Sequence, residues 1–431
     1  MKRIFLSSVL FAVACLGLFA QSGTNSPYSQ FGLGVLSDQT SGFNRGMNGL
    51  ALGFHEHNQV NYLNPASYSS IDSLSFIFDA GISGQLTNFK ENNMRVNAKN
   101  ASIEYVVAGF RAFKHVGMSF GVVPLTNIGY NYANAEFVGG THTTTATKTY
   151  SGTGGLHQVF LGIGWEPFKG FAFGVNGSYL WGDYERSLVS SYSDQYTNTL
   201  SKYYTADVRN YKVDFGLQYT ARLNKKSWLT LGLTYSLGHK LNANPECKVI
   251  STNSQTAVAD TTTFSVKNGL ELPHMFAGGL MYNYDNKLKV GVDYSFQKWA
   301  DIGFPQYVVT NDIPGYVLQK DMLLDRHKVI LGGEYCPKEN GRNFFQRVHY
   351  RAGVGYATPY IKVNGLDGPK ELSASLGLGI PIVNGYNNRS ILNVSAQWVH
   401  SSASGLITEN TFRLNIGLTF NERWFAKWKV E

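Results

Sequence analysis

The residues best suited to chemistry in this chain of 431 residues are few, and they do not converge on one reaction centre. His55-Glu56-His57 places three metal-ligating side chains in a row. Adjacent positions on a loop seldom meet at one metal without further ligands, so a solvated polar turn is the favoured interpretation and a metal site is the alternative. We therefore expect no metal and no cofactor.

Enzymatic and nucleic-acid-binding signatures are equally sparse. No phosphate-binding loop of the Gly-x-x-x-x-Gly-Lys-Ser/Thr type occurs, and no motif indicates that a serine and a histidine meet in the fold as a catalytic pair. The formal charge of +8 is spread thinly along the chain and forms no basic stripe. We predict that the protein is not an enzyme and does not bind nucleic acid.

The composition and the patterning of the chain instead favour a transmembrane β-barrel. Charged residues make up 15% of the sequence and aromatic residues 14%, which is typical of a wall with a lipid-facing surface and aromatic girdles. After the first twenty residues, no apolar run approaches the roughly 18–20 residues that a membrane helix needs. From Ser73 onward, apolar residues alternate with small polar ones. Such strands must close on themselves, because an open edge in lipid leaves amides without partners.

We predict fourteen antiparallel strands within residues 73–420, an even number as in bacterial outer-membrane barrels. Links after the even strands are short, as at 114–115, whereas several links after the odd strands are long, as at 132–153 and 243–269. Short turns at one end and long loops at the other are the pattern of such barrels. The predicted strands are 73–87, 98–113, 116–131, 154–166, 170–188, 204–222, 226–242, 270–284, 287–300, 323–336, 346–362, 369–381, 389–401 and 410–420.

Charged side chains on the polar face of these strands are candidates for the barrel interior. By alternation, the inward set is Asp79, Lys212, Asp214, Glu334 and Arg351. We expect them to pair with one another or with the segment that precedes the barrel. The sequence does not indicate that these side chains line a path for a substrate.

The two ends of the chain fall outside the predicted wall. Residues 1–20 have the basic start and apolar stretch of a secretory signal peptide, which would be removed together with Cys15. Residues 421–431 are expected to form a periplasmic tail, either interfacial or frayed. Cys247 and Cys336 are predicted at opposite ends of the barrel, too far apart for a disulfide, so both should be free thiols.

Residues 21–72 are rich in Gly and Asn and show neither a helix nor a strand period, so we predict a hatch inside the barrel. Asn64-Pro65-Ala66 is either a turn entering the first strand or a cap on backbone groups that the third strand leaves bare. Pro124 lies in the middle of that third strand, between Gly121 and Gly129. Proline breaks a strand ladder, so these residues mark either a gap in the wall or a bulge.

Asn64-Pro65-Ala66 before the first strand, together with the stretch Val116 to Leu125, resembles the FadL/TodX family of outer-membrane transporters, in the style of its Bacteroidetes members. The resemblance implies a fourteen-stranded barrel, a hatch that carries the Asn-Pro-Ala motif, and a third-strand kink that opens the wall sideways. It departs at the Thr- and Asn-rich loops (141–149 and 251–263), which are not the apolar helices that capture fatty acids in that family.

On this basis we expect an outer-membrane channel for small hydrophobic compounds, either fatty-acid-like or aromatic, with a lateral exit at the kink. The alternatives are a non-transporting scaffold or secretion-system shuttle component built on the same barrel, and an outer-membrane lipase. The expected partners are outer-membrane lipid, a hydrophobic small molecule and the outer-membrane assembly machinery. We expect a monomer.

Overall fold

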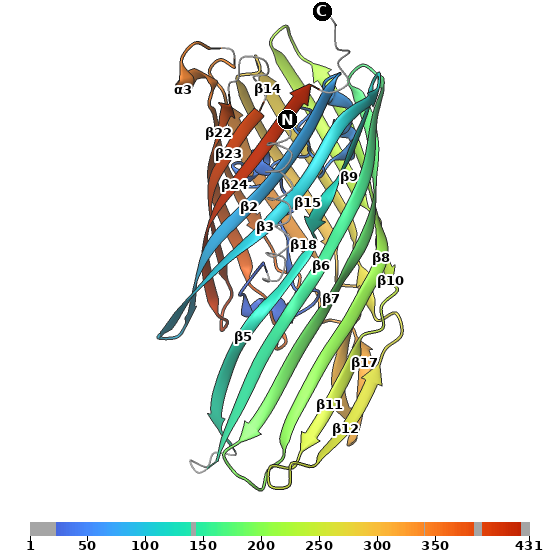
Figure 1. Cartoon of the computed structure of the whole chain (residues 1–431), viewed down its shortest axis with the longest axis vertical. Helices are drawn as coiled ribbons and strands as arrows, with labels where there is room; N and C mark the ends of the chain where they lie inside the picture. Colours follow the sequence, from blue (N-terminus) through green and yellow to red (C-terminus); the bar gives the residue numbers. More distant parts are fainter. Residues whose placement is uncertain (1–22, 139–143, 340, 383–389, 424–431) are drawn as a thin grey trace, which may run out of the picture.

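The wall of the molecule is a closed barrel of fourteen antiparallel strands, as the sequence predicted. The computed structural model describes residues 23–138, 144–339, 341–382 and 390–423. The barrel closes where the last strand pairs with the first (Figure 1). Its strands are β2 (Ser75–Glu91), β3 (Met94–Phe113), β4 (Val116–Pro124) continued by β5 (Thr126–Phe137), β6 (Thr145–Phe168), β7 (Phe171–Tyr192), β8 (Thr199–Arg222), β9 (Ser227–Ser236), β14 (His274–Tyr284), β15 (Leu288–Lys298), β18 (Arg326–Tyr335), β19 (His349–Ala357), β22 (Lys370–Ile382), β23 (Ser390–Ser402) and β24 (Thr408–Arg423).

Every predicted strand has a counterpart in this wall, although the bounds of several strands differ, as where the predicted strand 226–242 ends at Ser236. The third strand is interrupted at Leu125, which belongs to neither β4 nor β5. The last strand continues to Arg423, so the tail predicted from residue 421 begins later. The predicted signal peptide (residues 1–20) and the rest of the tail lie outside the described residues.

The alternation predicted from the sequence places apolar side chains outside and polar side chains inside. On β2, Phe78 and Ile82 are 41% and 46% exposed on the outer face, whereas Asp79 and Ser83, the residues that follow each of them, are buried. An apolar outer face with a polar interior is the arrangement of a transmembrane barrel. Among the described residues, no helix is long and apolar enough to cross a membrane.

One side of the barrel extends well beyond the rest at the end that carries the long connections, which we call the long-loop end (Figure 1). β6, β7 and β8 contain 24, 22 and 24 residues, about twice the 9–11 that a membrane-spanning strand needs. β11 (Glu246–Thr252) pairs with β8, and β12 (Ala259–Ser265) pairs with β11. β16 (Phe304–Thr310) and β17 (Ile313–Gln319) form a separate hairpin. Regions that the sequence indicated as loops therefore contain paired strands.

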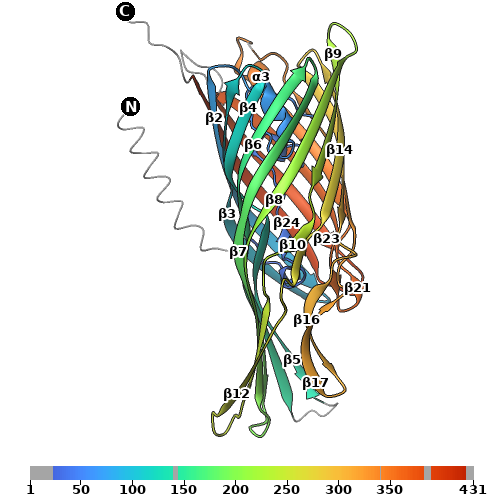
Figure 2. The same cartoon turned by 90° about the vertical axis from the view of Figure 1, so that its right-hand side faces the viewer.

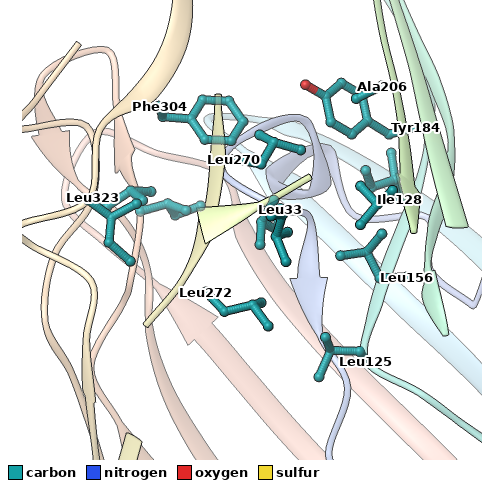
Figure 3. Packing of buried hydrophobic residues seen from close by; sticks show 14 of the residues in the cluster. Leu33, Leu125, Ile128, Leu156, Tyr184, Ala206, Leu270, Leu272, Phe304 and Leu323 are labelled. Atoms are coloured by element: carbon teal, nitrogen blue, oxygen red, sulfur yellow. The ribbon is translucent and has the colours of Figure 1, made fainter. Parts of the chain in front are cut away.

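A hydrophobic cluster packs together segments near the long-loop end of the barrel (Figure 3). Its side chains come from the N-terminal region, from the bent third strand, and from the short β10 (His239–Leu241) and β13 (Leu270–Leu272). Trp299 and Phe304 from the connection after β15 are buried in it. These segments are consequently packed in the manner of a protein core.

Residues 23–72, which we call the N-terminal segment, lie in the interior of the barrel and are enclosed by its wall (Figure 2). The segment contains the 3-10 turns η2 (Pro27–Gln30) and η3 (Pro65–Ser70), the short strand β1 (Val35–Leu36) and the helical turn α2 (Gly42–Arg45). Every residue from Thr40 to Phe54 is buried. α2 contacts β2 and β22 to β24, whereas η3 contacts β3, β4 and β6 to β8, so the segment reaches both sides of the interior.

Candidate functional site

The wall is interrupted where β4 ends and β5 begins. β3 pairs with β4 as far as Val106 opposite Val122. From Tyr105 back to Met94, β3 pairs with β2 alone among the described residues, and β5 does not pair with β3 (Figure 1). Pro124 is the last residue of β4. Because proline has no amide hydrogen, the ladder between β3 and the third strand cannot continue through it.

The three residues predicted to mark the kink bracket this interruption. Gly121 is still paired on both sides, with Val107 of β3 and Phe160 of β6. Pro124 retains only its partner on β6, His157. Gly129 lies beyond the interruption in β5 and pairs with Thr153 of β6. The wall therefore opens on the β3 side only, and β6 remains continuous behind it.

Glycines on β6 allow the third strand to bend here. Gly154 and Gly155 have φ angles of +120° and +140°, a region that side chains with a Cβ seldom adopt. A Cβ on Gly155 would lie 2.4 Å from the carbonyl oxygen of Thr126. The Leu125 amide donates to the Leu156 carbonyl at 2.7 Å across this bend.

The N-terminal segment covers the edge of β5 that β3 leaves bare. Val35 and Leu36 of β1 pair antiparallel with Asn127 and Thr126. The Gly129 amide donates to Ser29 Oγ at 3.1 Å. On the other side of the opening, Asn25 Nδ2 donates to the Lys99 carbonyl of β3 at 3.0 Å. Residues 25–36 thus lie between the two separated strands.

Asn64-Pro65-Ala66 lies elsewhere, so the predicted contact between Asn64 and the third strand is wrong. Asn64 Oδ1 accepts the Ala66 amide at 3.2 Å and caps η3. Its Nδ2 donates to the carbonyls of Leu52 and of Leu217 on β8, at 3.0 and 3.3 Å. The turn interpretation of the motif is confirmed, and the bare backbone is covered by β1 and Ser29.

Charged side chains fix the N-terminal segment to the wall near the opening. Asp38 accepts from Arg413 of β24 at 2.9 Å and lies 3.4 Å from Lys328 Nζ of β18. Arg45 pairs with Glu104 of β3 at 2.8 Å and donates to Asn415 Oδ1 of β24 at 2.9 Å. The segment is therefore tied to β24 and β3, which lie on either side of β2, and to β18.

The far side of the segment is held in the same way. Asp293 Oδ2 of β15 accepts the amides of Ala51 and Leu52 at 2.7 and 3.0 Å. Gln218 Nε2 of β8 donates to the carbonyl of Leu52 at 2.8 Å. Glu56 pairs with Lys289 of β15 at 2.7 Å. The segment is thus fixed to the wall on opposite sides of the interior.

His55-Glu56-His57 contact three different partners and do not converge. His55 Nδ1 lies 2.7 Å from Gln218 Oε1, and His57 Nε2 lies 3.9 Å from Asp72. Because Glu56 is engaged by Lys289, the turn is partly an anchor, which corrects the interpretation as a merely solvated turn. Within the described part of the chain, no group of three or more His, Cys, Asp or Glu residues is placed to hold a metal.

The charged residues predicted to point inward do so, and most pair as expected. Glu334 is buried between Arg351 at 2.7 Å and Lys289 at 3.2 Å. Lys212 pairs with Asp214. Asp79 accepts from the Tyr105 hydroxyl at 2.9 Å. Glu334 and Lys212 thus have partners of opposite charge in the interior, whereas the partner of Asp79 is a neutral hydroxyl.

Among the described residues, two cavities inside the barrel share residues 36–38 in their lining. The larger, of about 200 Å³, is lined by apolar residues including Leu36, Tyr62, Leu125 and Phe160 together with polar ones such as Lys212. The smaller, of about 150 Å³, is lined mainly by polar and charged side chains of β2, β18 and β24. Leu125, at the interruption of the wall, borders the larger cavity.

Other reactive groups are inert in this arrangement. Gly117-Met118-Ser119-Phe120-Gly121 has the letters of a Gly-x-Ser-x-Gly elbow, but it lies within β4, not at the strand-to-helix turn that the elbow requires. Ser119 is fully buried and donates to the Ala108 carbonyl at 2.8 Å. Cys247 and Cys336 are buried free thiols. None of these groups points to an enzyme.

Sequence reasoning missed Ser29, Asp38, Arg45 and Asp293, which position the segment. A lone Asp or Arg in a glycine-rich stretch gives no periodic signal. Asp293 alternates inward by parity and could have been added to the interior set. Ser29 and Asp38 could not be found, because their partners are set by how the segment folds inside the barrel.

These features define a transmembrane β-barrel with the fold of outer-membrane hydrocarbon channels, which confirms the resemblance to the FadL/TodX proteins. The chain is similar to the Pseudomonas putida toluene transporter TodX (14% identity, TM-score 0.63, covering 90% of this chain and 100% of TodX). It is also similar to the Ralstonia pickettii toluene transporter TbuX (11%, 0.62, 90% and 99%) and to the monoaromatic hydrocarbon channel CymD (14%, 0.59, 92% and 99%). At these identities the likeness establishes the fold. A family model described as BamG matches residues 1–431, and the chain belongs to the BamG family. No curated protein sequence matches it.

Proposed function

We propose that the protein is a bacterial outer-membrane channel that takes up small hydrophobic compounds and releases them sideways into the membrane beside Leu125. The observation that carries the proposal is the interruption of the wall next to an interior cavity with an apolar side. Backbone groups that lose their strand partner inside a membrane cost free energy. An interruption of the wall that persists despite this cost therefore supports a function for the opening. The N-terminal segment would act as the hatch that fills the opening when no compound passes.

The size of the cavity supports a compound with a single ring over a long-chain fatty acid. A cavity of about 150 Å³ lined by apolar side chains holds one benzene molecule, and the larger cavity here measures about 200 Å³. TodX and TbuX, which share the fold, are toluene transporters. In this proposal the long-loop end faces the cell exterior and the short turns face the periplasm.

A second candidate function is a non-transporting scaffold in the outer membrane. It is favoured by the hydrophobic cluster near the long-loop end and by the anchors that hold the N-terminal segment on opposite sides of the interior. Under this alternative the interruption of the wall is a structural bend, and the extended strands β6 to β8 present a rigid surface to partners.

Uptake of labelled toluene by whole cells, with and without the protein, tests the two candidates. Leu63→Trp would fill the larger cavity, which Leu63 lines. Leu231→Trp, on the lipid-facing side and 41% exposed, is the matched control. We expect Leu63→Trp to remove most of the protein-dependent uptake and Leu231→Trp to preserve it.

Folding of both variants is checked by the heat-dependent gel shift of the barrel. Equal uptake by cells with and without the wild-type protein would reject the channel and favour the scaffold. Uptake that survives in a folded Leu63→Trp variant would show that the compound does not pass through this cavity.

A further inference from the structure

We propose that the free edge of β5 is a docking site for an extended peptide segment of another protein, which joins the sheet as a strand antiparallel to β5. β5 is continuous with the long β6 to β8 sheet at the long-loop end (Figure 1). The proposal concerns a surface beyond the opening and does not depend on transport.

The backbone groups on the β3-facing edge of β5 have partners as far as Gly129. Beyond Gly129 this edge has no paired strand among the described residues. Asn127 pairs with Val35 of β1, and both the amide and the carbonyl of Gly129 contact Ser29 Oγ, at 3.1 and 3.4 Å. Because strand residues repeat their direction every second position, Asn131, Ala133 and Ala135 direct their amides and carbonyls to this same edge. Among the described residues, β5 beyond position 127 has only β6 as a paired strand.

This edge lacks the features that normally prevent strand addition. Natural edge strands carry lysine, proline, inward charges or bulges. The stretch from Thr126 to Ala135 has no charged residue and no proline, and Glu136 is the first charge. Asn131, Ala133 and Ala135 are exposed and small, so a second backbone can approach closely. β3, across the opening, carries Arg95 and Lys99 by contrast.

The chain itself shows that the edge accepts a strand, because β1 is a two-residue strand added antiparallel at its base. A partner peptide would continue that pairing with main-chain hydrogen bonds, the mode in which pockets for alternate side chains supply specificity. On one face of β5, Tyr130 is buried in the hydrophobic cluster and the partly buried Tyr132 stacks on Tyr150 with ring centroids 4.9 Å apart, so an apolar surface lies beside this face of the edge. The partner therefore needs aromatic or branched apolar residues at every second position and small residues between them.

A second copy of this chain does not fit the edge. Two copies in one membrane share the same direction across it, so a two-fold axis along the membrane normal makes their β5 strands run parallel. The antiparallel pairing that β1 displays is then unavailable, and a symmetric dimer would need an axis in the membrane plane. An extended segment from a different protein has no such restriction.

Hydrogen exchange of the full-length protein in detergent tests the proposal. The probe is a synthetic eight-residue peptide in which Thr alternates with Val or Tyr. At ten times its Kd, the peptide should slow exchange of the Asn131, Ala133 and Ala135 amides about ten-fold. Ala133→Pro should abolish the slowing at the other two positions, because the edge loses a donor and gains a steric block. Ala133→Ser, which keeps the backbone amide, should retain it.

Several outcomes would overturn the proposal. One is unchanged exchange at these three amides, and another is equal slowing in a folded Ala133→Pro variant. A third is slowing confined to a different edge strand, such as β12. A fourth is slow hydrogen exchange of the three amides without peptide that slows further at higher protein concentration. That result would show that a second copy of the chain occupies the edge.

Discussion

The contact between Asp293 and the N-terminal segment offers a direct measure of how firmly the segment is held. Asp293 is 5% exposed on β15. One of its oxygens, Oδ2, accepts both the Ala51 amide at 2.7 Å and the Leu52 amide at 3.0 Å. Asp293→Ala removes both hydrogen bonds and leaves two buried donors without this acceptor.

The magnitude follows from the charge on the acceptor. Hydrogen bonds to a charged group contribute roughly 1.5–3 kcal/mol each, so losing two should cost about 3–6 kcal/mol. If this loss lowers the free energy of local opening of the turn by the same amount, the Ala51 and Leu52 amides should exchange hydrogen about 10²- to 10⁴-fold faster. Asp293→Asn can keep an oxygen at the Oδ2 position without the charge, so we expect about half of that loss.

Hydrogen exchange read by mass spectrometry on peptides covering residues 49–54 provides the assay. Asp207→Ala is the control, since the Asp207 side chain is 65% exposed and its partner Arg209 is 3.3 Å away. Exposed pairs contribute about 0–1 kcal/mol, so this variant should match the wild type. If the Ala51 and Leu52 amides of Asp293→Ala exchange hydrogen at the wild-type rate, the reasoning is refuted. The turn would then be held by its other contacts.

Three further predictions concern the interior. Glu334→Ala should destabilise the barrel by about 3–5 kcal/mol in denaturant unfolding, because Arg351 loses a buried carboxylate 2.7 Å away; a loss under 1 kcal/mol would contradict this. Gly117→Ala should lower the temperature at which the folded gel band disappears, because its Cβ would lie 1.8 Å from the Tyr68 carbonyl oxygen, whereas Gly177→Ala, with nothing within 4 Å, should not. For Asp38, burial raises the pKa, but Lys328 and Arg413 outweigh it, and the pKa falls below the ordinary 3.8. Its contribution is therefore complete above that value and is lost as the pH falls through the lowered pKa, so the melting difference between wild type and Asp38→Asn should stay constant above about pH 5 and shrink only in stronger acid.

The wall could be predicted from the sequence because its physics is local and periodic. Leu229, Leu231 and Leu233 must share a face whatever the rest of the chain does. Pro124 signalled the end of a ladder for an equally local reason, since it has no amide to donate. The number of strands and the site of the interruption followed from such rules.

The contacts of the N-terminal segment could not be predicted in this way. Asn64 reaches Leu217 of β8, and Ser29 reaches Gly129 of β5. Both partnerships depend on how an aperiodic segment folds inside the barrel, and the residue types allow many acceptors. The strands β11 and β12 were missed because their Thr-rich sequence indicated a polar loop, although β-branched Thr also favours strands.

The anchors of the N-terminal segment also constrain the order in which the protein can fold. Arg45 and Asp38 bind Asn415 and Arg413, positions 370 and 375 residues further along the chain. The segment synthesised first therefore cannot reach its final place until the last strand is present. Contacts of such high sequence separation slow folding, and the wall must close at β2 and β24 around a segment already inside it. Closure of the barrel and seating of the segment should be one concerted and rate-limiting event.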